Sequence, residues 1–140
     1  MAHDLRLSNE TVNAEAEAFS PLANSGYLRI YTVGSGRPAT ADTAITDQVL
    51  LAELRMNAAA FGAASNGVLT AAAITGEDAA LATGTAAFYR LLKSNGTAAL
   101  CDGEVGVSGG GSDLELVGTT TITIGLPVNV TSFTHTVTKQ

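Results

Sequence analysis

The stretch that most constrains the fold of this chain is residues 84–107. Two apolar runs, 84–94 and 97–107, flank the dipeptide Asn95-Gly96. Asn-Gly between alternating runs is the strongest short-range signal for a β-hairpin. Successive side chains of a strand point to opposite faces, and neither face of these runs is purely polar. The sequence therefore predicts a hairpin deep inside a sheet rather than at its margin.

The length and composition of the chain predict one domain over residues 1–140. A chain of this size buries roughly two-thirds of its unfolded surface, which is enough for an independent core. Only 5% of the residues are aromatic and 14% are charged, whereas 15 are glycine. This mixture suits short strands and many turns. The low charge also favours extensive contact with other proteins.

The charge of the chain argues against nucleic-acid binding. The net charge is −6, and the five arginines and two lysines are scattered, whereas a nucleic-acid partner requires clustered basic residues. The first residues lack the basic and apolar segments of a signal peptide. No run approaches the roughly 18 apolar residues of a membrane span. We expect a protein made in the cytoplasm that does not enter a membrane.

One helix is predicted, over residues 9–19. Ser8 is a favourable N-cap, and Pro21 disfavours helical geometry in the residue before it. Apolar residues recur on one helical face: these are Val12, Ala16 and Phe19.

The pattern in the rest of the chain predicts short strands separated by turn-forming residues. Besides the hairpin, strand-like segments cover residues 27–33, 49–56, 68–74, 114–117, 119–124 and 128–138. Asn66-Gly67 is a second hairpin signal, and a switch of the apolar face within 128–138 indicates a bulge or a change of sheet. We therefore predict an all-β protein: a β-sandwich of about eight short strands with one short N-terminal helix. The long connections 34–48 and 75–83 favour a jelly roll.

No pattern in the sequence predicts catalysis. The two histidines, His3 and His135, do not stand in a Ser/His/Asp or Cys/His arrangement. The single cysteine, Cys101, is expected to be a small buried hydrophobic residue of a strand, with a reactive thiol as the alternative. We predict no catalytic residues, no metal site and no cofactor, and therefore no enzyme.

Two further patterns fall short of a ligand site. Gly34-Ser-Gly36-Arg37 resembles half of a phosphate-binding loop, but Pro38 and coil follow it instead of a helix. Acidic residues flank the glycine-rich segment 108–113, but their spacing matches no defined calcium loop.

Two places are candidates for contact with a partner protein. Arg29 and Tyr31 share one face of a predicted strand, and both residue types are enriched at interface hot spots. An ordinary amphipathic sheet surface with arginine stacked on tyrosine is the alternative for this face. Arg37 and Pro38 lie on a long irregular loop, residues 34–42, which is expected to be exposed together with the N-terminal segment.

Several motifs together resemble a known family. They are Leu28-Arg-Ile-Tyr31, Asp42-Thr-Ala-Ile45 followed by Leu50-Leu-Ala-Glu-Leu54, Phe61-Gly-Ala-Ala-Ser-Asn-Gly-Val68 and Ala82-Thr-Gly-Thr-Ala-Ala-Phe-Tyr-Arg90. The chain is similar over nearly its whole length to the capsid cement, or decoration, proteins of short-tailed bacteriophages. These motifs consist of turn glycines and core strands, so they carry no active site.

The resemblance implies a jelly-roll virion protein on the outer surface of an icosahedral capsid. Its partner would be the major capsid protein, which it would cement so that the expanded head is stabilised, and it would associate with itself as a homodimer. The family brings no enzymatic activity and no cofactor, and no contact residue is carried over from it. The alternative is another phage module of the same fold, associated with a tail or fibre and binding a receptor or glycan.

Overall fold

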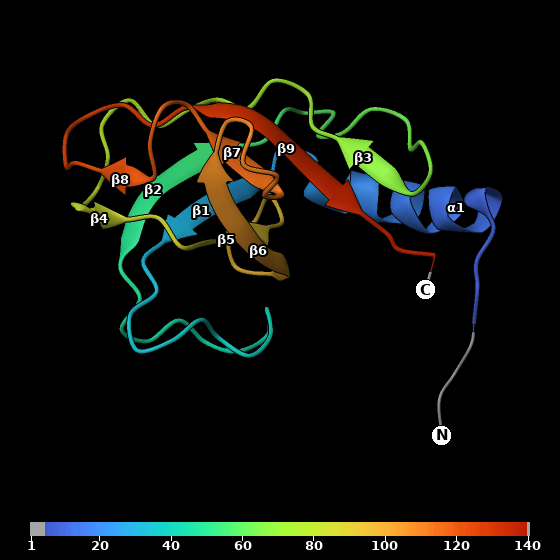
Figure 1. Cartoon of the computed structure of the whole chain (residues 1–140), viewed down its shortest axis with the longest axis horizontal. Coiled ribbons are helices and arrows are strands. Elements are labelled where there is room, and N and C mark those ends of the chain that lie inside the picture. The colour runs from blue at the N-terminus through green and yellow to red at the C-terminus, as the bar shows by residue number, and fades with distance from the viewer. Residues whose placement is uncertain (1–4, 140) are drawn as a thin grey trace.

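The computed structural model describes residues 5–139, and over this range the chain is mostly β-sheet with one α-helix (Figure 1). Seven strands form one mixed sheet in the order β2-β1-β5-β6-β7-β9-β3, and β4 pairs with β8 separately. The strands are β1 (Tyr27–Tyr31), β2 (Leu50–Arg55), β3 (Val68–Thr70), β4 (Gly84–Thr85), β5 (Phe88–Leu92), β6 (Ala99–Val107), β7 (Leu114–Leu116), β8 (Thr121–Ile122) and β9 (Val130–Thr136). The predicted β-rich class with one short helix is confirmed.

The helix α1 (Asn9–Phe19) has the predicted bounds. The Ser8 hydroxyl accepts a hydrogen bond from the Thr11 N–H at 3.2 Å, which satisfies one of the open donors of the first turn. At its other end the chain continues as a short 3₁₀ turn (Ser20–Ala23) that contains the predicted breaker, Pro21. The ring of Phe19 stacks on His135 of β9 at 3.9 Å, which ties the helix to the sheet.

The predicted central hairpin is confirmed as β5 and β6, which pair antiparallel in the middle of the sheet. All five residues of β5 are buried. The turn is wider than an Asn-Gly two-residue turn, because the Lys93 N–H bonds to the Ala98 carbonyl at 2.9 Å. The Asn95 side chain accepts from the N–H groups of Thr97 and Ala98, so it holds the turn in this wider form. Residues 84 and 85 leave the hairpin to form β4.

The second Asn-Gly signal does form a two-residue turn. Asn66 and Gly67 both have positive φ, +52° and +79°, and Ser65 and Val68 exchange two backbone hydrogen bonds. This is the geometry of a type I′ turn.

The last strand contains the predicted bulge. Glu115 pairs with Ser132, but Leu116 pairs with Val130, so Thr131 is the extra residue. Beyond the bulge, β9 pairs on its other edge with β3. The switch of apolar face in the sequence therefore marks the point where the strand changes its neighbour.

One pairing departs from the expected hairpins: β6 and β7 run parallel. Only residues 108–113 join them, whereas a parallel connection usually needs a dozen residues or more. Gly109 and Gly111 have φ of +84° and +85°, which lets this short segment reverse twice. Glu115 fixes the turn, because its carboxylate accepts from the Gly111 N–H and the Ser132 hydroxyl.

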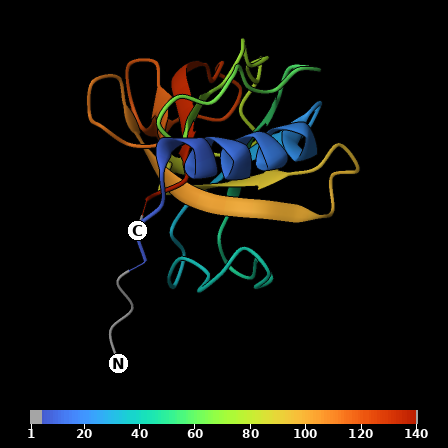
Figure 2. The ribbon, with the colours of Figure 1, turned by 90° about the vertical axis from the view of Figure 1, so that its right-hand side faces the viewer.

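The sheet presents two different sides. Figure 2 shows α1 on one side of the β5–β6 hairpin and the connection between β1 and β2 on the other. In both views, residues 5–8 and 137–139 leave the body on the side of that connection (Figures 1 and 2). Within the described residues, no helix is long and apolar enough to cross a bilayer.

Candidate functional site

A row of four charged residues crosses the sheet on the side of the β1–β2 loop (residues 32–49). Glu53 of β2 pairs in register with Arg29 of β1, Arg29 with Arg90 of β5, and Arg90 with Asp102 of β6. The charges therefore run acid, base, base, acid across four strands. Leu28 and Ile30 flank Arg29 on β1 and are fully buried on the opposite face, as the alternation predicts.

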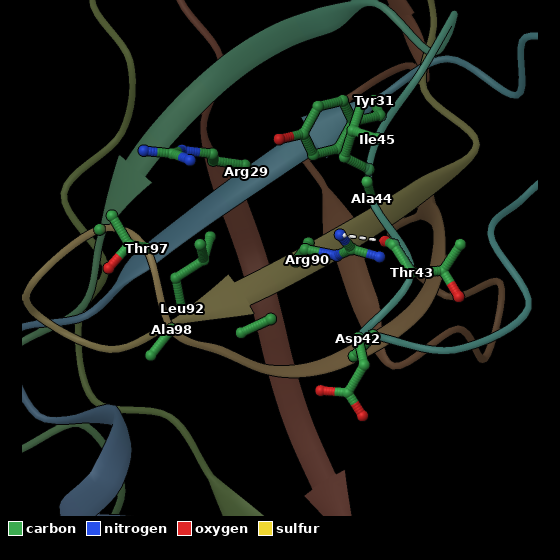
Figure 3. Close-up of a pocket in the computed structure, with 13 residues that line it drawn as sticks. Arg29, Tyr31, Asp42, Thr43, Ala44, Ile45, Arg90, Leu92, Thr97 and Ala98 are labelled. Atoms are coloured by element: carbon green, nitrogen blue, oxygen red, sulfur yellow. Dashed lines mark hydrogen bonds between the residues drawn. The ribbon is translucent and has the colours of Figure 1, made fainter.

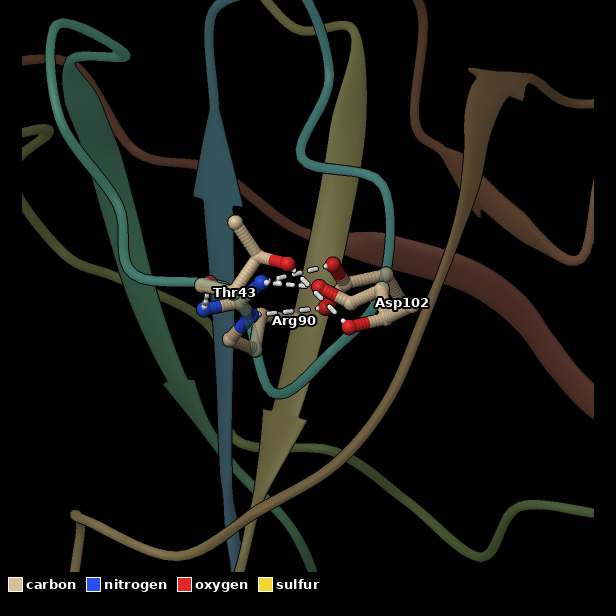
Figure 4. Close-up of polar contacts among 4 residues, drawn as sticks. Thr43, Arg90 and Asp102 are labelled. Atoms are coloured by element: carbon tan, nitrogen blue, oxygen red, sulfur yellow. Dashed lines mark hydrogen bonds and ion pairs between the residues drawn. The ribbon is translucent and has the colours of Figure 1, made fainter.

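The inner pair, Arg90 and Asp102, is almost completely buried. Their side chains are 7% and 5% exposed, and the guanidinium meets both carboxylate oxygens at 2.7 and 2.8 Å. This hydrogen bonding to Asp102 raises the pKa of Arg90. Arg90 also donates to the carbonyls of Thr43 and Thr40 at 2.8 and 3.2 Å (Figure 4). It therefore fastens the tip of the β1–β2 loop onto the sheet.

The base of the same loop is fastened separately. The Asp47 carboxylate accepts from the N–H and the hydroxyl of Ser35 at 2.9 and 3.0 Å. The hydrogen bond from the Ser35 hydroxyl is the main reason why the pKa of Asp47 is lowered. The buried Gln48 side chain donates to the Gly36 carbonyl. The loop is thus held at its base and at its tip, although it contains no helix or strand.

A pocket of about 650 Å³ lies between this loop and the sheet (Figure 3). Its floor is formed by Arg29, Tyr31, Arg90 and Leu92. Residues 41–45 of the loop form one wall and residues 96–99 of the hairpin turn form the other. Arg29 bonds through Nε to Glu53 at 2.7 Å, and this outer pair is only half-buried, with side chains 27% and 33% exposed.

The four predicted contact residues fall into two groups. Arg37 is exposed and Pro38 half-buried on the β1–β2 loop between its two anchors. Arg29 and Tyr31 line the pocket. Tyr31 is buried, and its ring stacks on Phe88 with 5.3 Å between the ring centroids.

The alternative for this strand face, arginine stacked on tyrosine, also occurs. The guanidinium of Arg55 lies 4.3 Å from the ring centroid of Tyr27, and that of Arg29 lies 5.9 Å from it. The ion pair between Arg90 and Asp102 was not predicted from the sequence. Both residues are charged and lie on the two mostly apolar strands of the hairpin. Two opposite charges on paired apolar strands could have indicated a buried ion pair.

A second cluster of titratable side chains lies on the α1 side of the sheet. Tyr89, Cys101, Asp113 and His135 line a pocket of about 210 Å³ together with Asp102. Burial raises the pKa of the half-buried Cys101 thiol to about 12, so the thiolate needed for nucleophilic attack is scarce at neutral pH.

Within residues 5–139, no three His, Cys, Asp or Glu side chains are grouped so that they could hold a metal ion. His3, the other histidine considered in the sequence, lies outside the described residues.

The stacked His135 gives a pH dependence with a defined sign. Burial lowers the pKa of this imidazole below its usual 6.5, with Asp113 acting in the opposite direction. The neutral form is therefore favoured by folding. Its contribution to stability is complete above about pH 6.5 and declines as the pH falls below that value.

We expect wild-type protein to lose more unfolding free energy between pH 7.5 and pH 5 than the His135→Phe variant. The variant keeps an aromatic ring against Phe19 but cannot titrate. Urea unfolding at both pH values measures the difference, and every other titratable group is common to both proteins. An equal pH dependence would mean that His135 is not the group responsible.

Comparison with known proteins gives no relative: no protein-family model matches the chain, and no curated protein or solved structure matches it either.

Proposed function

We propose that this chain is a structural virion protein that binds the outer surface of a tailed-phage icosahedral capsid and cements major capsid proteins together, so that the expanded head is stabilised. The observation that carries the proposal is the β1–β2 loop, which is fastened at its base and at its tip and extends from the same side as residues 5–8 and 137–139. The finer fold assignment, a jelly-roll connectivity within this β-rich chain, belongs to the same proposal.

A clamp benefits from a loop that is already ordered. Binding costs free energy for every segment that must be immobilised, and a preorganised loop avoids much of that cost. Arg90 holds the β1–β2 loop through the carbonyls of Thr43 and Thr40, and Asp47 holds it through Ser35, so neither anchor uses the side chain of Arg37. Arg37 therefore remains available to a partner surface on a loop of fixed shape.

Self-association as a homodimer is also part of the proposal. Residues 117–138 contain no charged side chain, although the chain carries a net charge of −6. Apolar side chains at the β4–β8 end are half exposed or more: Leu81 50%, Val117 59%, Ile124 61% and Leu126 56%. Exposed apolar surfaces of this kind mark interaction sites in proteins.

The alternative function is a tail- or fibre-associated module that binds a receptor or glycan. The pocket of about 650 Å³ favours it, because concave sites with a few polar groups suit small ligands. The two functions differ in the particle that the protein recognises.

The experiment is cosedimentation of the purified chain with DNA-free expanded heads, with isolated tails and with host cells. We expect saturable binding to heads alone. Binding to tails or cells without binding to heads would favour the alternative module and contradict the cement proposal.

Reversing the charge of the loop tests the assigned surface. Arg37→Glu should weaken head binding by about tenfold, because a rim charge contributes mainly to electrostatic complementarity. Ala18→Glu, which adds an acidic residue at an exposed position of α1 on the other side of the sheet, is the matched control and should bind heads as the wild type does. If heads bind as much Arg37→Glu protein as wild-type protein, this loop is not part of the contact surface.

A further inference from the structure

The floor of the 650 Å³ pocket contains two arginines in direct register. Arg29 and Arg90 are cross-strand neighbours of β1 and β5. Like charges directly opposite each other destabilise a sheet, and here the compensating carboxylates of Glu53 and Asp102 bond to the arginines from the two outer strands. Positions that break a local rule of sheet stability are expected at functional sites.

The two guanidinium groups differ in how many of their N–H groups are already used in hydrogen bonds within the protein. Arg90 uses Nε, Nη1 and Nη2 on Asp102 and on two loop carbonyls. Arg29 uses Nε on Glu53, and the Tyr31 hydroxyl lies close enough to interact with this guanidinium, so its terminal nitrogens are only partly engaged. Nη2 faces the hairpin turn: a Cβ built on Gly96, which lines the pocket, would lie 3.6 Å from it.

The remaining N–H groups of Arg29 reach solvent. Among the described residues, no fully buried side-chain nitrogen or oxygen lacks a hydrogen-bond partner. The terminal nitrogens of Arg29 therefore belong to its exposed part, at the edge of the pocket. A guanidinium presents these donors as a planar fork that matches the two oxygens of a carboxylate.

The rest of the lining is largely small and apolar. It includes Ala41, Ala44, Ile45, Leu92, Ala98 and Ala99. The acidic residue of the lining, Asp42, lies at the end of the pocket opposite Arg29 in Figure 3. One end of the pocket thus presents the positively charged guanidinium of Arg29, and its apolar walls can pack against a short hydrocarbon chain of a ligand.

We propose that this pocket binds a carboxylate carried on a short apolar stem, with the terminal N–H groups of Arg29 holding its oxygens. Such a ligand is either a free short-chain acid or a glutamate side chain on a partner protein. The site does not depend on capsid binding, since the pocket lies within one chain.

The probes are butyrate and the blocked peptide acetyl-Ala-Glu-Ala-amide. Binding is followed by ¹H–¹⁵N NMR of the arginine Nε–H signals and of the backbone amides of residues 96–99, which line the pocket and remain in the variants below. We expect butyrate to shift the Arg29 signal with a dissociation constant of roughly millimolar size, given so few ligand atoms. Neutral butyramide should cause no saturable shift. Tighter binding of the peptide than of butyrate identifies a partner side chain as the source, whereas binding of butyrate alone identifies a free acid.

Variants separate this site from general charge attraction. Arg29→Gln should weaken butyrate binding at least about tenfold, through loss of the charged fork. The matched control is Arg55→Gln, which removes an arginine of the neighbouring strand β2 that does not line the pocket. Thr97→Glu, on the exposed hairpin turn, should abolish binding by placing a carboxylate at the pocket itself, and it tests the site even where Arg29→Gln fails to fold. Butyrate binding that survives both Arg29→Gln and Thr97→Glu, or equal binding of butyramide, would overturn the proposal.

Discussion

Replacing Arg90 with methionine should lower the unfolding free energy by about 3–5 kcal/mol, because it leaves the Asp102 carboxylate buried without its partner. Asp102 is 5% exposed, and both of its oxygens bond to Arg90. Methionine keeps an apolar stem of similar length, so most of the loss comes from the uncompensated charge. Urea unfolding monitored by circular dichroism measures the change.

Two further variants isolate that cause. Arg29→Met breaks the outer, half-exposed pair with Glu53 and should cost no more than about 1 kcal/mol, because water screens an exposed ion pair. The double variant Arg90→Met with Asp102→Leu removes both buried charges and should recover much of the lost stability. Equal losses for Arg90→Met and Arg29→Met would show that burial of the inner pair does not determine its importance.

The second large effect is expected at Gly103 of β6. A Cβ at this position would overlap the ring and hydroxyl of Tyr89, its cross-strand neighbour. Tyr89 is 2% exposed and packs edge-on against Phe133 at 5.0 Å, so it has no room to move aside. Gly103→Ala should therefore destabilise the protein by about 1–3 kcal/mol, as overpacking of a core does.

Gly106 is the matched control on the same strand. A Cβ there would meet only the side chain of Ser112, which belongs to the glycine-rich turn after β6 and is half exposed. Gly106→Ala should therefore stay within about 0.5 kcal/mol of the wild type, as surface substitutions usually do. If thermal unfolding gives the same midpoint for both alanine variants, contact with Tyr89 is not what requires glycine at position 103.

The elements that the sequence predicted correctly depend on local signals. The helix was bounded by Ser8 and Pro21, and the two Asn-Gly pairs marked both hairpin turns. The bulge in β9 was visible as a switch of its apolar face. Each of these signals lies within about ten residues of the feature that it predicts, so no tertiary information was needed.

What the sequence could not reveal depends on pairing between distant segments. The parallel β6–β7 pair follows from a six-residue turn that usually would not support it. The row of charges requires the register of β1 against β5, and Arg29 and Arg90 are far apart in the chain. The alternation of side chains assigned each arginine to one face of its own strand. It could not predict that β1 and β5 pair so that both arginines lie side by side on the floor of one pocket.

The central claim is that this protein stabilises an expanded capsid from outside. The most direct measurement is the heat resistance of DNA-free expanded heads, with and without saturating protein, together with the number of bound copies per major capsid protein. Because a ligand that binds only the assembled shell stabilises it, we predict a higher disruption temperature and about one bound copy per capsid subunit. Heads that disrupt at the same temperature with no protein attached would contradict the claim.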